Sequence, residues 1–499
     1  MPSQWDRLVT KLRDMNDIGS AYSLLEWDQA SFMPRKGGPE RARVVGTMAR
    51  LAHERLIDPE LGELLDELHD DPSLDHPQRA SVHVLKRQRD KATKVPSDLV
   101  IALKESEMRG YQAWTETKPS ADFDAFRPFI AETVRLKKQE ADALGWVNER
   151  YDACLDHFEP DMTAVEVEAL FVELIDGLQP MAAEILDAAG PKPDFLLKAY
   201  DAQGQIDFCN ALVDRMGFDR DGGRLDFSPH PFTIRIAHGD VRQTLAVEES
   251  DLMMSIYAAI HETGHALYDQ GFPDAFAGLP IADAPSMGMH ESQSRLWENH
   301  VGRSRAFTDH MLPLLKERFD QQLGATDPDE FHRGVNHPER SLIRIKADEV
   351  TYNLHVALRF ELELGLFRDE LEVDDLPDAW DAAMEKHLGI RPQNHAEGVM
   401  QDMHWADGYF GYFPTYSLGT LYAAAFFEKM TNDIGPVDDA LRAGDCSAVL
   451  RWLQHNIHSQ GYLYPAKDLA RRVLGRDISA QPFLDYVRAK YGTIYSLSI

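Results

Sequence analysis

The segment His261-Glu-Thr-Gly-His265 combines residue types that can hold and use a metal ion. On a helix, residues four apart share one face about one turn apart, so both imidazoles can reach a single tetrahedral ion. Glu262 adjoins the first histidine, and its carboxylate can reach a metal-activated water without binding the ion. We therefore interpret His261 and His265 as ligands of a zinc peptidase centre and Glu262 as its general base. Cobalt is the alternative ion, because site geometry and availability decide which metal is resident.

The motif alone is not specific, because a surface helix with two histidines has the same pattern. Gly264 adds information, since glycine inside a helix costs about 1 kcal/mol relative to alanine, which indicates close packing or a functional reason. A third ligand is offered by a predicted helix over 289–299, where either His290 or Glu291 can complete the set. We prefer Glu291, which gives two histidines, one carboxylate and an open position for water. Its alternative role is an ordinary helix carboxylate. Glu298 is predicted to orient a ligand histidine.

Helical periodicity dominates the elements that must position these residues. Apolar residues recur at three- and four-residue steps, with charged residues between them, over 3–30, 39–56, 77–94, 97–116, 124–145 and 163–189. The metal segment lies in an apolar-rich run from Leu252 to Gln270, with Ser250 as the expected N-cap and Gly271 just after the C-terminus. Low-complexity stretches, repeats and Gly/Ser linkers are missing from the sequence. We therefore expect a mainly α fold and a single catalytic domain over 1–499.

One stretch, residues 232–247, departs from the helical pattern. Its apolar residues alternate with period two around His238-Gly-Asp240, which predicts a β-hairpin. A lone hairpin is marginally stable, so it must pack on another element, and the metal helix follows it directly. We expect an edge strand that can hold an extended peptide through backbone hydrogen bonds. The alternative is a structural flap without substrate contact.

Charge and composition exclude several classes of function. The formal net charge is −31 at pH 7, and no basic run is available to neutralise phosphates, which argues against nucleic-acid binding. An anionic membrane surface would repel this chain, and no apolar run is long enough to span a bilayer. The three cysteines, Cys154, Cys209 and Cys446, are far apart and are expected to be reduced and buried. The first residues lack the apolar core of a signal peptide. We therefore expect a cytoplasmic enzyme.

Motifs spread along the chain carry a family resemblance. They are Glu26-Trp-Asp28, Met33-Pro34, His230-Pro-Phe232, Asp240-Val-Arg-Gln-Thr244, His261-Glu-Thr-Gly-His265, His290-Glu-Ser-Gln-Ser-Arg295, Ile343-Arg-Ile-Lys-Ala-Asp-Glu349, Gly398-Val-Met-Gln-Asp-Met-His-Trp405 and Phe410-Gly-Tyr-Phe-Pro-Thr-Tyr416. In this order and over nearly the whole chain, they resemble the Taq-type metallocarboxypeptidases. These are helical gluzincins similar in fold to neurolysin and to angiotensin-converting enzyme.

The resemblance implies a large helical body with a deep active-site groove between two helical halves and a small β-hairpin or sheet near the zinc helix. It also implies a homodimer that removes C-terminal residues from peptides, with Glu291 as the third zinc ligand. Donors for the developing oxyanion are expected from His404 and Tyr412, in a Gly-rich aromatic segment. The alternatives are a satisfied buried histidine and a packed core aromatic.

A carboxypeptidase must bind the free carboxylate of its substrate, and an arginine does this best. Arg344 is our first candidate and Arg242 the second. The alternative for either is a structural ion pair, which for Arg344 would be with Asp348 at i+4. Asp240 and Asp348 are expected to be structural or to support ligands. His230 is expected to line the substrate groove or to cap the hairpin.

Two other functions are weighed against the zinc carboxypeptidase. An endo-oligopeptidase or dipeptidyl carboxypeptidase needs an open subsite where the carboxypeptidase places a cation. An inactive helical binding protein has no use for the general base Glu262 beside the metal.

Overall fold

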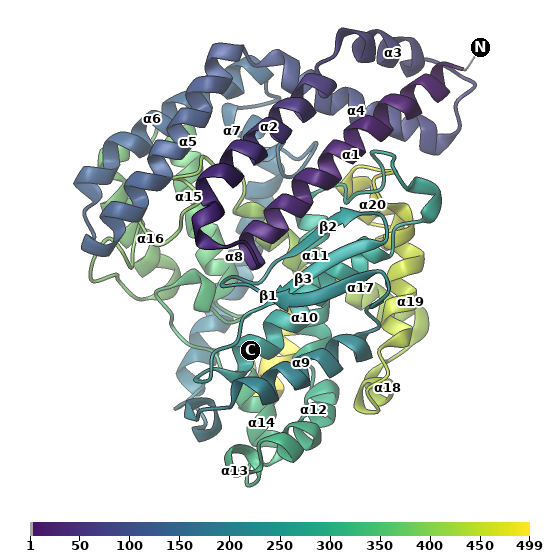
Figure 1. The fold of residues 1–499 in the computed structure, drawn as a ribbon. Coiled ribbons are helices and arrows are strands. Elements are labelled where there is room, and N and C mark those ends of the chain that lie inside the picture. The colour runs from purple at the N-terminus through teal and green to yellow at the C-terminus, as the bar shows by residue number, and fades with distance from the viewer. Residues whose placement is uncertain (1–2) are drawn as a thin grey trace.

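Helices make up most of the chain in the computed structural model, which describes residues 3–499 (Figure 1). The N-terminal part consists of α1 (Gln4–Ser31), α2 (Gly38–Leu56), α3 (Pro59–His69), α4 (His76–Lys94), α5 (Ser97–Thr117), α6 (Phe123–Leu144), α7 (Arg150–Leu155), α8 (Ala164–Ala188) and α9 (Ala202–Met216). The six predicted helices correspond to α1, α2, α4, α5, α6 and α8, with ends within about two residues of those predicted. The mainly α fold is confirmed.

The second part of the chain continues the helical body after a short sheet. It contains α10 (Leu252–Gln270), α11 (Met287–Arg295), α12 (Arg305–Arg318), α13 (Asp320–Leu323), α14 (Pro328–Val335), α15 (Tyr352–Phe367), α16 (Leu376–Leu388), α17 (Pro414–Ile434), α18 (Asp438–Arg442), α19 (Ser447–Asn456), α20 (Ala466–Leu474) and α21 (Gln481–Tyr495). Between α11 and α12, residues Leu296–Gly302 form a π-helix. This rare form is frequent at functional sites.

The predicted hairpin is confirmed, but it is part of a larger sheet. Strands β2 (Thr233–Ala237) and β3 (Asp240–Leu245) pair antiparallel, and β1 (Gly223–Phe227) pairs parallel with β3 on its other side. The order β1-β3-β2 leaves β2 at an edge. Figure 1 shows the sheet between α1 and the helices behind it, and both β2 and β3 contact α10. The third strand supplies the support that an isolated hairpin lacks.

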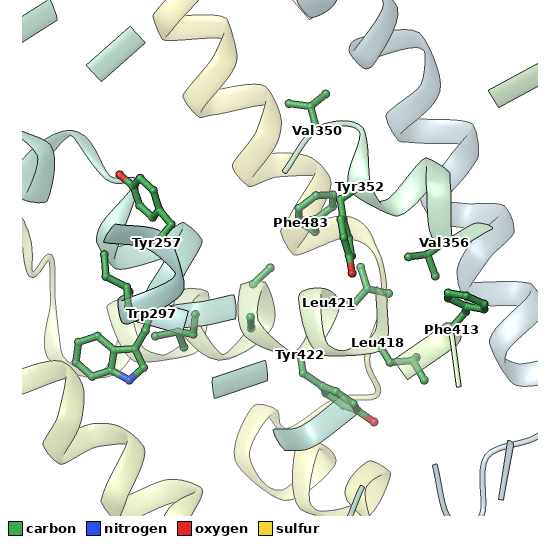
Figure 2. Packing of buried hydrophobic residues seen from close by; sticks show 14 of the residues in the cluster. Tyr257, Trp297, Val350, Tyr352, Val356, Phe413, Leu418, Leu421, Tyr422 and Phe483 are labelled. Carbon is green, nitrogen blue, oxygen red and sulfur yellow. The ribbon is translucent and has the colours of Figure 1, made fainter. Parts of the chain in front are cut away.

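One large hydrophobic core connects α6–α21. Figure 2 shows part of it, with Trp297 and Tyr257 on one side and Tyr352, Phe413 and Leu418 on the other. The N-terminal helices have a smaller core of their own, built from leucines of α1 and α3 with Val82 and Leu85 of α4. Apolar burial of this extent is the main stabilising contribution to a helical body of this size.

The three cysteines are free and buried, as expected. Burial raises the pKa of Cys209 and of Cys446 to about 12, so both stay protonated thiols at neutral pH. Over residues 3–499, no helix is both long enough and apolar enough to cross a bilayer.

Candidate metal centre and active site

Helix α10 carries His261 and His265 one turn apart. The helix is capped by Asp251, whose side chain accepts a hydrogen bond from the backbone N–H of Met254. The predicted cap, Ser250, is therefore wrong by one residue, because aspartate and serine are comparable caps and sequence patterns do not separate adjacent candidates. Gly271 follows the helix as predicted, with φ −86° rather than the left-handed conformation. The helix boundaries themselves are those predicted.

The three predicted ligands lie together. Their ligand atoms are within 4.8 Å of one another. Oε2 of Glu291 lies 3.6 Å from Nε2 of His261 and 3.3 Å from Nε2 of His265. Two imidazole nitrogens and one carboxylate oxygen form the donor set of catalytic zinc sites, which keep a further position open for water. The residues therefore fit a zinc-type ion.

The other ring nitrogen of each histidine has a partner. Nδ1 of His261 lies 3.0 Å from Oε2 of Glu298, on the π-helix. Nδ1 of His265 lies 2.6 Å from Nδ1 of His290, whose Nε2 lies 3.3 Å from Oδ1 of Asp269. With Nδ1 engaged in this way, Nε2 of both histidines faces Oε2 of Glu291, where it would be available to hold a metal ion. His290 therefore contacts the candidate ligand His265. It also contacts Asp269, a residue that was not predicted from the sequence.

Glu291 is buried, and its charge is balanced within the protein. Burial alone would raise its pKa, but Arg295 and the two histidines outweigh burial and hold the pKa of Glu291 well below its usual range. Nε of Arg295 donates to Oε1 of Glu291 at 2.7 Å. The carboxylate therefore stays ionised, which is the form that binds a metal.

Two glycines allow the helices to meet at the ligands. A Cβ at Gly264 would lie 2.7 Å from Cα of Ser294, so the glycine lets α10 and α11 pack backbone to backbone. This confirms the close packing expected from Gly264. A Cβ at Gly419 would lie 2.6 Å from Cγ of Glu291, so α17 also approaches the ligand closely.

Glu262 is held by the edge strand of the sheet. Oγ1 of Thr233, on β2, donates to Oε2 of Glu262 at 2.7 Å and lies 3.0 Å from its backbone oxygen. The Glu262 side chain is buried, with 8% of the residue exposed. The hairpin was expected beside the metal helix, but Thr233 was not predicted. Thr233 alternates with Ile234 and Ile236 along β2. This alternation was the one sequence signal that the Thr233 side chain lies on the opposite face of the strand from the two isoleucines.

His404 and Tyr412 lie on the connection between α16 and α17. Their rings are stacked, with centroids 5.5 Å apart. Burial and the nearby charge of Arg344 lower the pKa of His404 to about 4, so its ring is neutral at pH 7. Burial and the charge of Glu291 raise the pKa of Tyr412 to about 12, so its hydroxyl keeps its proton. Both side chains are therefore neutral hydrogen-bond donors.

Arg344 is buried in an ion pair, but not with the residue proposed from i+4 spacing. It lies on a short 3₁₀ turn, and Nε and Nη2 donate to Oδ1 of Asp402 at 3.1 and 2.8 Å. Arg359 of α15 donates to Oδ2 of the same carboxylate at 2.8 and 2.5 Å. Asp348 instead accepts the backbone N–H groups of Glu339, Val350 and Thr351. Residues 344–348 are not in an α-helix, so i+4 spacing does not bring Arg344 and Asp348 together.

The remaining candidates lie on or beside the sheet. Arg242 pairs with Asp240 at 2.7 Å and lies over the ring of Trp27 at 4.3 Å. His230 is exposed, and its backbone oxygen accepts a hydrogen bond from Ser228. Arg242 thus contacts the sheet and α1, and His230 contacts Ser228, just after β1.

A cavity of about 980 Å³ lies elsewhere, against α4 and residues 144–148. It contains none of the candidate residues, and its cations Arg87 and Lys91 are paired with Asp156. The candidate site is identified by metal-binding side chains that lie close together, and not by the volume of a cavity.

Comparisons with known proteins agree with this geometry. The family described as carboxypeptidase Taq (M32) metallopeptidase matches residues 7–491. Thermostable carboxypeptidase 1 of Thermus thermophilus is 41% identical over 98% of this chain and 99% of its own, and carboxypeptidase 1 of Bacillus subtilis is 34% identical over 97% of each. The crystal structure of an M32 carboxypeptidase from Deinococcus radiodurans has a TM-score of 0.97 at 37% identity, covering 99% of this chain and 100% of that one.

Proposed function

The chain belongs to the carboxypeptidase Taq (M32) family and is a metallocarboxypeptidase, and we propose that it uses zinc to release single amino acids from peptide C-termini. The observation that carries this proposal is the convergence of His261, His265 and Glu291 beside an oriented Glu262. The relatives are named carboxypeptidases, which favours this function over the endo-oligopeptidase and dipeptidyl alternatives. An inactive binding protein is disfavoured because the general base is present.

Glu262 is the proposed proton carrier. When bound, zinc supplies Lewis-acid polarisation of a water molecule and of the scissile carbonyl. Thr233 holds Oε2 of Glu262, and the other oxygen, Oε1, would take the proton of the attacking water. Glu262 then delivers this proton to the leaving amine. Thr233 is therefore proposed to fix the carboxylate's orientation.

His404 and Tyr412 are the proposed donors to the developing oxyanion. At pH 7 the lowered pKa of His404 leaves a neutral imidazole with one N–H, and the raised pKa of Tyr412 keeps its O–H, so each has one proton to donate in a hydrogen bond. Removing one such donor typically costs about 3–4 kcal/mol of transition-state stabilisation.

Arg344 is the proposed partner of the substrate's terminal carboxylate. Arg344 and Arg359, both buried, carry two positive charges against the single negative charge of the partly buried Asp402. An excess positive charge in a protein interior favours an arriving carboxylate. Arg242 remains the second candidate, and its pairing with Asp240 makes it the weaker one. We keep His230 as a groove residue by resemblance alone.

The cellular setting is also proposed. Three buried, unpaired cysteines favour the reducing cytoplasm. The homodimer rests on the family resemblance, and sedimentation analysis of the purified chain will test it. The single catalytic domain is supported by the family match over residues 7–491.

The test is a time course with defined peptides, read by mass spectrometry. Stepwise loss of single C-terminal residues is expected, with activity removed by a chelator and restored by zinc. Loss of intact dipeptides or internal cleavage would overturn the proposal. Glu262→Gln should retain the metal, measured by elemental analysis, and lose turnover.

A further inference from the structure

Glu363 of α15 is a buried carboxylate that has no assigned role in the reaction. It is 0% exposed and accepts three hydrogen bonds. Oε1 accepts from Nε1 of Trp405 at 2.6 Å, and Oε2 accepts from the backbone N–H of Gly411 at 2.9 Å and from the hydroxyl of Tyr151 at 2.5 Å. Two of the three donors belong to one loop.

The two loop donors have a specific relation to the candidate catalytic residues. Trp405 directly follows His404, and Gly411 directly precedes Tyr412. One carboxylate therefore binds both ends of the segment 405–411. The residues just outside that segment are His404 and Tyr412. Their rings lie 5.5 Å apart. Fixing the ends of the segment fixes the separation of these two rings.

The loop lies outside regular secondary structure, so such side-chain contacts must define it. Gly411 has φ +85°, and a Cβ there would lie 2.5 Å from the backbone carbon of Cys154. Arg359, one turn before Glu363 on α15, holds Asp402 at the start of the loop. Adjacent turns of one helix therefore bind the loop at Asp402, Trp405 and Gly411.

Keeping this carboxylate buried is costly. Burial raises the pKa of Glu363 to about 7, even though three donors oppose the shift. An apolar residue would pack here without that cost, so the carboxylate is retained for the hydrogen bonds it makes.

We propose that Glu363 is a positioning residue of the carboxypeptidase reaction. It holds the rings of His404 and Tyr412 at a fixed separation by binding Trp405 and Gly411 with separate oxygens. This inference rests on the proposed roles of His404 and Tyr412. Glu363 itself acts only through the loop.

Glu363→Gln is the informative substitution because it keeps the shape and removes one acceptor. A glutamine has one oxygen and one NH₂ group. If its oxygen faces Gly411 and Tyr151, its NH₂ opposes the N–H of Trp405. If its oxygen faces Trp405, its NH₂ opposes the N–H of Gly411. One loop contact is lost in either orientation.

Tyr151→Phe is the matched control. It removes a hydrogen bond to the same buried carboxylate, but Tyr151 belongs to α7 and not to the loop. Both variants are compared by kcat and KM on a short peptide, per mole of bound zinc, and by Tm. A displacement of about 1 Å in a reacting group can cost up to about a hundredfold in rate. We expect kcat of Glu363→Gln to fall at least about tenfold with KM within about twofold, and kcat of Tyr151→Phe to stay within about twofold. Both variants should lower Tm.

The proposal is overturned if Glu363→Gln keeps its kcat per zinc, or if Tyr151→Phe loses as much kcat. If Glu363→Gln does not fold, Trp405→Phe decides, because it deletes one loop donor and leaves Glu363 in place. An unchanged kcat in that variant also overturns the proposal, as does an unchanged kcat in both His404→Ala and Tyr412→Phe. Failure of the proposed function is seen separately, in the products released by the unmodified enzyme.

Discussion

Nδ1 of His261 lies 3.0 Å from Oε2 of Glu298, so a histidine of the candidate metal site is oriented by a carboxylate seven residues beyond Glu291. Glu298 lies on the π-helix Leu296–Gly302, and Arg303 lies 3.3 Å from its other oxygen. Burial would raise the pKa of Glu298, but its hydrogen bond with His261 and the charges of Arg295 and Arg303 lower that pKa to about 2. The partner of His261 is therefore a fully ionised carboxylate.

Glu298→Gln should weaken metal binding about 10–100-fold, because partners that orient metal ligands contribute to affinity on this scale. The measurement is a zinc titration against a competing chelator. Glu361→Gln is the control, since Glu361 makes a carboxylate–histidine contact of the same length, 3.0 Å, with His387 away from the metal. Equal zinc affinities in the two variants would contradict the role of Glu298.

Arg344→Gln should lose activity selectively on substrates with a free C-terminal carboxylate. Removing one member of a buried, hydrogen-bonded charge pair typically costs about 2–5 kcal/mol in binding, so kcat/KM should fall at least about thirtyfold. Arg242→Gln is the matched variant, since Arg242 also pairs with an aspartate but lies on the sheet. The measurement compares free and amidated versions of one peptide. A loss of the same size on both peptides would remove Arg344 as the anchor.

The local features of the site could be predicted from sequence. Helical periodicity located α10 within a residue at each end, and i, i+4 spacing put His261 and His265 on one face. Gly264 indicated close packing because glycine is unfavourable inside a helix, and a Cβ there would indeed meet the backbone of α11. In each case the sequence signal lies within a few residues along the chain, although the contact that Gly264 allows is with α11.

Apart from the placements of Glu291 and Glu298, the long-range features were not predicted. Arg344 and Asp402 are 58 residues apart, Glu363 and Gly411 are 48 apart, and Thr233 and Glu262 are 29 apart. Strand β1 pairs with β3, although β2 lies between them in the sequence. The short sequence of β1 therefore does not indicate its partner. Such pairings depend on how helices pack, which periodicity alone does not determine.

Gly419→Ala should lower both stability and zinc affinity. The added methyl group would lie 2.6 Å from Cγ of Glu291, so helix α17 or the ligand must move. Overpacking of this kind costs about 1–3 kcal/mol. Gly46→Ala is the control, because Gly46 is inside helix α2 with nothing within 4 Å of the added Cβ. That variant should be more stable by about 1 kcal/mol. Calorimetry and the zinc titration check both results, and a Gly419→Ala protein with normal zinc affinity would contradict the prediction.

Buried neutral histidines should make the protein sensitive to acid. Burial lowers the pKa of His300 and His458 to about 3 and that of His332 to about 4. An unfolded histidine titrates near pH 6.5, so below that pH the unfolded chain binds protons that these three residues cannot bind in the native state. Stability therefore falls as pH decreases from about 6.5 to about 4, by up to about 1.4 kcal/mol per pH unit for each histidine.

His300→Phe tests this expectation, because the ring of His300 already packs against Phe427 and Tyr486. The variant lacks one of the three groups, so its free energy of unfolding should depend less steeply on pH between about 6.5 and about 4. Denaturant unfolding at several pH values measures both slopes at constant ionic strength. If the two proteins show the same slope, His300 is protonated in the native state, and burial does not keep it neutral.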